Sequence, residues 1–290
     1  MTPQLDAPAV IASLIVAGLL LASACIWYRH SQNRDKQLYP ESQLSAWPIG
    51  WINFGILLCA LITAIFVAQQ IVAFALGDSI QAADGEFTAE LAIAGVAIIQ
   101  IPLLFTFFGL RYFYPQHYSG QLNSQTMSTL AALKASSLLF IKYIPIIWIS
   151  SLLWGTLLNV LQYLGLIDEL PPQEIIGIFQ AGGNFFAILL LSLSAVILAP
   201  IAEEIIFRGC IYRFLKSQTQ RPAAQLISGA VFASIHGNLL SFVPLTVVGV
   251  LLARVYEESG NIKAPIIFHA CFNGFTLCML FLFSLSDIQI

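Results

Sequence analysis

The segment from Pro200 to Arg208 places two carboxylates and one guanidinium next to a strongly apolar stretch, residues 185–199. Each ionisable side chain near the centre of a bilayer costs roughly 2.5–3.5 kcal/mol on insertion scales, so such a cluster indicates a functional site. Glu204 and Arg208 are four residues apart with the acid first, the favourable order for a helical ion pair. We therefore predict that Glu204 pairs with Arg208, which leaves Glu203 as an unpaired carboxylate.

Three further polar side chains lie in apolar segments closer to the C-terminus. His236 ends one such segment, and His269 and Asn273 lie four residues apart in the last. Residues at this spacing share one face of a helix. One histidine in a membrane span is usually a hydrogen-bonded packing residue, but two of them, with an amide and a carboxylate pair, indicate chemistry.

These residue types support two hydrolytic mechanisms, between which the sequence does not choose. In the first, Glu203 and His236 activate a water molecule, while His269 and Asn273 donate hydrogen bonds to the developing oxyanion. In the second, Glu203, His236 and His269 bind a catalytic Zn²⁺ ion that keeps an open fourth position. A third interpretation is purely structural, in which the same groups form an ion-pair network that locks helices together.

The composition is that of a polytopic membrane protein. The chain has 290 residues, of which 58% are hydrophobic and 9% charged, whereas soluble domains carry about 25% charged residues. No basic stripe suggests a nucleic-acid partner. Motifs of serine hydrolases, nucleotide triphosphatases and dinucleotide-binding enzymes are missing as well. A proton-coupled transporter gains no support because no internal repeat is visible.

We predict an all-α bundle of about eight transmembrane helices. The sixth and seventh apolar segments are shorter than about 20 residues, so we expect protein to surround them. Residues 115–137 form a polar connector, with a short surface helix near 127–137. We predict an N-terminal shell over 1–137 and a catalytic core over 138–290. The eight segments cover residues 8–28, 47–76, 91–110, 140–164, 185–212, 223–236, 242–256 and 264–283.

The distribution of charge predicts the orientation of these spans. With both termini outside, all 12 Lys and Arg residues fall on the inner side, as the positive-inside rule requires. The acidic loops near residues 78–90 and 168–174 then fall outside. We expect the site to face the cytoplasmic side, because Arg208, Arg213 and Lys216 follow it in the sequence.

Three motifs together resemble those of a known family. Glu203-Glu204-x-x-x-Arg208, Phe232-x-x-x-His236 and His269-x-x-x-Asn273 occur in this order. They are similar to the motifs of the CAAX protease and bacteriocin-processing (CPBP) family of intramembrane endopeptidases. That family includes the eukaryotic and archaeal enzymes that trim prenylated CAAX proteins. The likeness covers about residues 181–284.

The resemblance implies a role for each motif residue. Glu203 would activate water with His236 as its partner, His269 and Asn273 would stabilise the oxyanion, and Glu204 and Arg208 would support them. It favours a mechanism without a metal cofactor, with Zn²⁺ as the open alternative.

The expected activity is hydrolysis of a peptide bond in a membrane-attached protein or peptide, which a lipid group can anchor. The expected location is a bacterial cytoplasmic membrane. The alternative is a non-catalytic membrane adaptor or bacteriocin-immunity-like protein whose polar network is structural.

Overall fold

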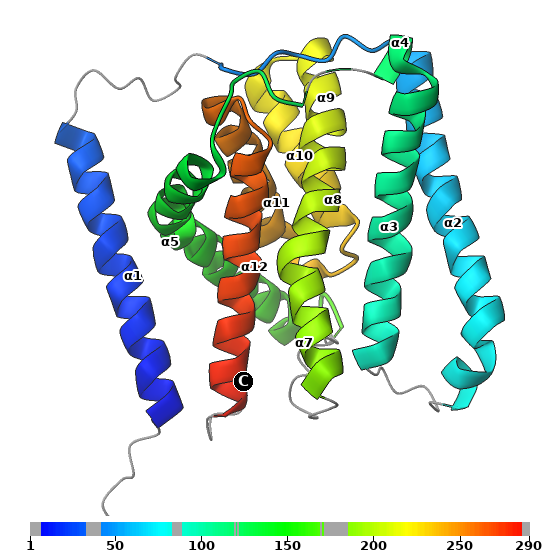
Figure 1. Cartoon of the computed structure of the whole chain (residues 1–290). Coiled ribbons are helices and arrows are strands. Elements are labelled where there is room, and N and C mark those ends of the chain that lie inside the picture. Colours follow the sequence, from blue (N-terminus) through cyan, green and yellow to red (C-terminus); the bar gives the residue numbers. More distant parts are fainter. Residues whose placement is uncertain are drawn as a thin grey trace, which may run out of the picture.

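The computed structural model describes residues 7–32, 42–82, 89–118, 120, 122–168, 170 and 185–285. These residues form helices joined by short irregular segments, and no strand occurs among them. Figure 1 shows most helices running between two ends of a bundle, with the start of α1 and the end of α12 at the same end. The all-α polytopic architecture predicted from the sequence is confirmed. Most of the acidic loops lie outside the described residues.

Each of the eight predicted segments coincides with a helix. The fifth is a continuous rod built from α7, η1, α8, η2 and α9, in which η1 and η2 are π-helical turns. The helices are α1 (Ala7–Gln32), α2 (Trp51–Ala82), α3 (Ala89–Phe113), α4 (Pro115–Tyr118), α5 (Thr129–Tyr163), α7 (Phe185–Leu193), η1 (Ser194–Leu198), α8 (Ala199–Ile206), η2 (Phe207–Tyr212), α9 (Arg213–Gln218), α10 (Arg221–Ser234), α11 (Leu239–Ser259) and α12 (Lys263–Ser284).

Six helices of the described chain are long and apolar enough to cross a membrane. They include α11, which has 21 residues. The prediction that the seventh span is shorter than about 20 residues is therefore wrong. Its helix begins at Leu239, because the side chain of Asn238 accepts a hydrogen bond from the Ser241 amide and caps it. In contrast, α10 has only 14 residues, as predicted for the sixth segment, and α3 contributes a shorter apolar section, Ile98–Phe113.

The predicted surface helix near residues 127–137 is wrong, because these residues form the first turns of α5. This helix has 35 residues and begins where Ser128 caps the amide of Ala131. Ala132 and Ser136 are fully buried, and the Ser136 hydroxyl donates to the carbonyl of Ala264 in α12. The small side chains that suggested a polar loop are what allow two helix backbones to approach closely. The predicted boundary between residues 137 and 138 therefore falls inside α5.

Burial is concentrated at the end of the bundle where α9 passes into α10, which we call the basic end. The segment 42–50 crosses this end, and Arg213 donates to the carbonyls of Ser45 and Ala46. Lys216 and Tyr212 both bond to Glu257 Oε1, each at 2.6 Å. These contacts tie the chain that precedes α2 to the ends of α9 and α11. The helices that carry the motif residues are thus held firmly at the basic end.

Candidate functional site

The carboxylate pair lies on α8 between two π-helical turns. In η1 the amide of Ala199 bonds to the carbonyl of Ser194, five residues earlier. In that register the carbonyl of Ala195 would bond to the amide of Pro200, but proline has no N–H. The Ala195 carbonyl instead accepts a hydrogen bond of 2.8 Å from the Asn273 side chain in α12. The sequence thus creates an unfilled backbone acceptor, and Asn273 fills it.

The predicted ion pair between Glu204 and Arg208 is confirmed. Arg208 Nη1 lies 2.9 Å from Glu204 Oε1, and both side chains are fully buried. The same carboxylate oxygen lies 2.9 Å from Nδ1 of His269 in α12. Because an ionised carboxylate only accepts hydrogen bonds, Nδ1 of His269 must donate to it. Glu204 therefore orients the His269 ring so that the other ring nitrogen, Nε2, points away from the ion pair.

Arg208 also contacts α10 and α11. Its Nη2 donates to the carbonyl of Gly249 at 3.2 Å, and its guanidinium carbon lies 4.5 Å from the centre of the Phe232 ring. The backbones of α10 and α11 touch at this level, since a Cβ atom on Gly249 would lie 2.6 Å from the Cα atom of Gly229. The guanidinium thus connects four structural elements, which are α8, α10, α11 and, through Glu204, α12.

Glu203 points in a different direction from Glu204. Its Oε2 atom is buried without a hydrogen-bond partner and lies 3.9 Å from Nε2 of His269. The Glu203 side chain is 14% exposed, whereas that of Glu204 is completely buried. A gap of 3.9 Å is too long for a direct hydrogen bond and suits a bridging water molecule. Glu203 and His269 therefore form a carboxylate–imidazole pair whose facing atoms lie close together without a direct hydrogen bond.

His236 lies just beyond the last residue of α10, in the turn that leads to α11. Its ring is exposed, and Nδ1 lies 2.7 Å from the carbonyl oxygen of Phe232. The Phe232 ring separates the two histidines, with its centre 4.8 Å from that of His236 and 5.7 Å from that of His269. The ring of His236 thus lies against the same aromatic side chain as the ring of His269. The hydrogen bond of His236 is made to a carbonyl of its own helix.

The structure therefore joins Glu204, Arg208 and His269 by direct bonds and brings Glu203 to within 3.9 Å of His269. His236 joins this group through Phe232, and Asn273 lies one helical turn from His269 with one of its two N–H groups bonded to Ala195. The contact roles of Phe232 and Ala195 were missed in the sequence. The available signal for Ala195 was its position five residues before a proline within a helix.

The candidate zinc ligands are not assembled as a metal site. Among the described residues, no group of three His, Cys, Asp or Glu side chains has the geometry to hold a metal ion. The Nδ1 bonds of His236 and His269 leave Nε2 of each ring for a ligand, as in many metal sites, but the two rings lie against Phe232 and do not converge with Glu203 on one point. The residues present do not fit the proposed Zn²⁺ ion, and we derive no step from it.

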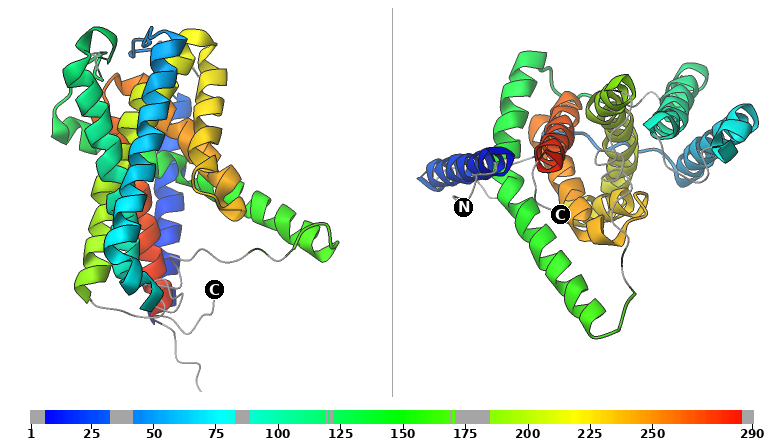
Figure 2. Two further views of the ribbon diagram at one scale, coloured as in Figure 1. Left: turned by 90° about the vertical axis from the view of Figure 1, so that its right-hand side faces the viewer. Right: turned by 90° about the horizontal axis from the view of Figure 1, so that it is seen from below.

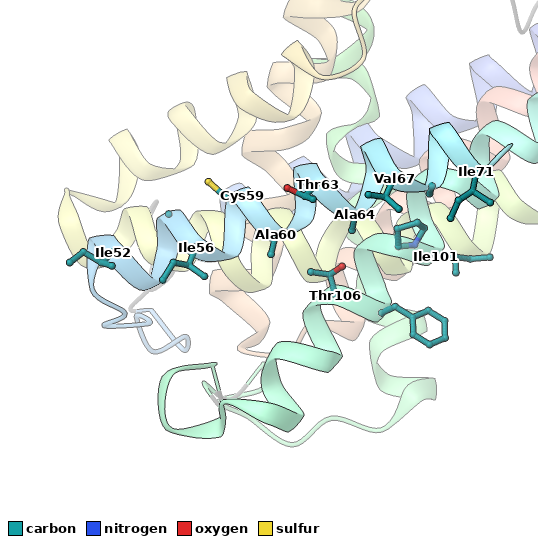
Figure 3. Close-up of a pocket in the computed structure, with 14 residues that line it drawn as sticks. Ile52, Ile56, Cys59, Ala60, Thr63, Ala64, Val67, Ile71, Ile101 and Thr106 are labelled. Carbon is teal, nitrogen blue, oxygen red and sulfur yellow. The ribbon is translucent and has the colours of Figure 1, made fainter. Parts of the chain in front are cut away.

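An apolar groove lies away from this site, on the outer face of α2 and α3 (Figure 3). It has a volume of about 1040 Å³ and contains no ionisable group other than Cys59. Residues from Ile52 to Ile71 line it on α2, and residues from Ile101 to Thr106 line it on α3. Such a face is what lipid chains contact in a membrane, so the groove is not a second candidate for the chemistry.

Comparison with known proteins gives matches over the region that contains the candidate site residues. Residues 184–275 match the family profile described as type II CAAX prenyl endopeptidase Rce1-like. The chain is also 33% identical over 107 residues to the protein named "Putative membrane peptidase YdiL" of Bacillus subtilis (strain 168). That alignment covers 37% of this chain and 41% of the Bacillus protein, so the chain spans about two fifths of the relative's length. No solved structure matches the chain.

Proposed function

We propose that the chain is an intramembrane endopeptidase of the CPBP family of CAAX-type proteases, because residues 184–275 match the Rce1-like profile. The observation that carries this proposal is the buried Oε2 of Glu203, which has no partner and faces Nε2 of His269 across 3.9 Å. A buried carboxylate without a hydrogen bond is costly to stability, and such groups are retained where chemistry requires them.

Glu203 is the proposed base. A water molecule between Glu203 Oε2 and His269 Nε2 would give a proton to the carboxylate and attack the carbonyl carbon of the scissile peptide bond. The carboxylic acid so formed would pass that proton to the amine that leaves. Among the described residues, the imidazole of His269 is the group within ion-pair distance of Oε2, at 3.9 Å.

His269 and Asn273 are the proposed donors to the oxyanion. The bond from Nδ1 to Glu204 fixes the ring so that Nε2 faces the site, where an N–H on that nitrogen would point at a substrate oxygen. Asn273 retains one N–H group beyond its bond to Ala195, which is available to a substrate oxygen.

His236 is the proposed partner of Glu203, as the resemblance implies. In the structure its exposed ring lies against Phe232, and catalytic hydrogen bonds often form only when a substrate is bound. The proposed substrate is a membrane-attached protein or peptide, with or without a lipid group. We place the protein in a bacterial cytoplasmic membrane with the basic end inside and both termini outside, following the positive-inside rule.

A cleavage assay with matched glutamate variants tests this function. The protein would be reconstituted in liposomes with a quenched fluorescent peptide that ends in a farnesylated CAAX sequence, and with the same peptide without the lipid. We expect Glu203→Gln to abolish cleavage, by about 10²–10⁴-fold for the loss of a general base. Glu258→Gln should retain it, because Glu258 pairs with Arg254 on α11 and is one quarter exposed.

The design also covers substrates that the reporter peptides do not represent. New protein termini would be compared in membranes of cells that express the wild type, Glu203→Gln or Glu258→Gln. Identical termini in all three samples would refute the endopeptidase. Metal analysis of the purified protein, with cleavage measured before and after chelation, tests the zinc alternative.

A non-catalytic adaptor is the second candidate, and one observation favours it. The network of Glu204, Arg208 and His269 joins α8, α10, α11 and α12 in a fully buried position, as a structural lock would. An adaptor predicts that Glu203→Gln alters partner binding or thermal stability while no peptide bond is cut by either protein.

A further inference from the structure

His236 lies in the turn that joins α10 to α11, and the backbone of this turn is irregular. Gly237, the next residue, has a φ of +61°, a conformation that glycine adopts at little cost. The amides of His236 and Gly237 each bond at 3.2 Å to a carbonyl in the last turn of α10. Asn238 caps the start of α11 by accepting a bond of 3.1 Å from the Ser241 amide. These bonds all lie within the two helices that the turn connects, so they do not hold the turn against the rest of the protein.

Among the described residues, one hydrogen bond reaches the turn from a different helix. Trp154 in α5 donates its indole N–H to the carbonyl oxygen of Leu239 at 2.8 Å, across 85 positions of the chain. Leu239 is the first residue of α11 and follows Asn238 directly. A backbone carbonyl has two lone pairs, so this oxygen can accept the indole bond in addition to a bond within α11. Trp154 thus holds the chain just after His236.

The second half of α5, residues 147–163, is largely exposed. Both panels of Figure 2 show this part of the helix extending away from the other helices. Leu152 and Tyr163 are 69% and 90% exposed, and the hydroxyl groups of the two serines bond within α5 itself. Within the described part of the chain, the bond from Trp154 is therefore the hydrogen bond that joins this half of α5 to another helix.

A second tryptophan in the same half of α5 provides a contrast. The ring of Trp148 packs against Phe275 in α12 with ring centres 5.8 Å apart, and none of the described residues accepts a hydrogen bond from its N–H. Both α5 and α11 are long and apolar enough to cross a membrane, so water in the hydrocarbon region does not compete for the bond of Trp154. The two tryptophans therefore differ in whether the indole N–H ties α5 to a neighbouring helix.

We propose that Trp154 is a positioning residue for His236, because it holds the start of α11 and with it the turn. This inference rests on the proposed function, in which His236 assists Glu203. The last turn of α10 holds one end of the turn and Trp154 holds the other, which restricts the motion that Gly237 permits. Such restriction matters for a reaction, since a displacement of about 1 Å can cost about 10²-fold in rate. Trp154 lies outside residues 184–275, so this contact extends the unit that positions the site beyond the region matched by the family profile.

Hydrogen exchange tests the hold on the turn without any cleavage. The variant is Trp154→Phe, which keeps an aromatic ring and removes the N–H, and the matched control is Trp148→Phe. Mass spectrometry of the purified protein in detergent micelles would follow the backbone amides of residues 235–241. We expect exchange about fivefold faster than in the wild type for Trp154→Phe, the change that loss of one neutral hydrogen bond gives. Trp148→Phe should exchange like the wild type, and peptides from α10 should be unchanged in both variants.

The liposome cleavage assay then measures the effect on the reaction. We expect Trp154→Phe to lower kcat about tenfold and to change KM less than about twofold, because the bond positions a reacting group and does not bind substrate. A merely structural role would reduce the amount of folded protein instead. In that case kcat per folded molecule would equal that of Trp148→Phe.

The two measurements separate this inference from the proposed function. Exchange in Trp154→Phe that equals the wild type over residues 235–241 overturns the positioning role. Faster exchange with kcat per folded molecule equal to that of Trp148→Phe overturns it as well. A wild type that cuts no peptide bond, in liposomes or in the comparison of protein termini, refutes the endopeptidase and with it any role of Trp154 in the reaction.

Discussion

Two ion pairs of this chain allow the energetic effect of burial to be measured directly. Glu204 pairs with Arg208 and Glu258 pairs with Arg254; both pairs are four residues apart and have a nitrogen–oxygen distance of 2.9 Å. The side chains of the first pair are 0% exposed, whereas those of the second are 26% and 25% exposed. The pairs therefore differ in burial and in the further bonds of the first pair, since Glu204 also accepts from His269 and Arg208 also donates to Gly249.

We predict that Glu204→Gln lowers the free energy of unfolding by about 3–5 kcal/mol, because the buried guanidinium of Arg208 loses the carboxylate that it bonds to directly. Glu258→Gln should cost at most about 1 kcal/mol, since water screens its partner. The opposite order of acid and base in the two pairs contributes only about 0.2–0.5 kcal/mol. The double variant Glu204→Gln/Arg208→Met should recover part of the loss, because it removes the stranded charge as well.

The measurement is unfolding of the purified protein in mixed micelles by titration with a denaturing detergent, followed by tryptophan fluorescence. Glu204→Gln and Glu258→Gln would be compared at two salt concentrations. Equal losses for the two variants would refute the assignment of a desolvated pair. A loss for Glu204→Gln that falls strongly with salt would do the same, because a buried pair is screened little.

Two further substitutions test the close contacts around the site. Gly249→Ala should destabilise the protein by about 1–3 kcal/mol, since its methyl group would overlap Gly229 in α10. The control is Gly155→Ala, whose methyl group meets no atom within 4 Å. This variant should be neutral or more stable by up to about 1 kcal/mol. Thermal unfolding of both variants measures the difference, and a Gly249→Ala protein as stable as Gly155→Ala would contradict the tight packing. Asn273→Ala should cost about 1 kcal/mol of stability, because the Ala195 carbonyl loses its donor. It should also lower the cleavage rate, and an unchanged rate in the liposome assay would remove Asn273 from the oxyanion site.

Much of the architecture could be predicted because a bilayer imposes simple rules. Apolar runs of sufficient length become helices, and the eight predicted segments all coincide with helices. The ion pair between Glu204 and Arg208 was predictable too, since it depends only on spacing along one helix. The exceptions are α5, which extends back to Thr129, and α11, which is longer than its most apolar section. In both, a side-chain cap and packing against neighbouring helices set the start.

The chemical types of the site residues and their positions along each helix are local properties, and the sequence contains them. Contacts between helices are not local, because they depend on how far each helix is rotated and displaced against its neighbours. Only the folded protein shows that His269 bonds to Glu204 and faces Glu203, and that His236 reaches the site through Phe232.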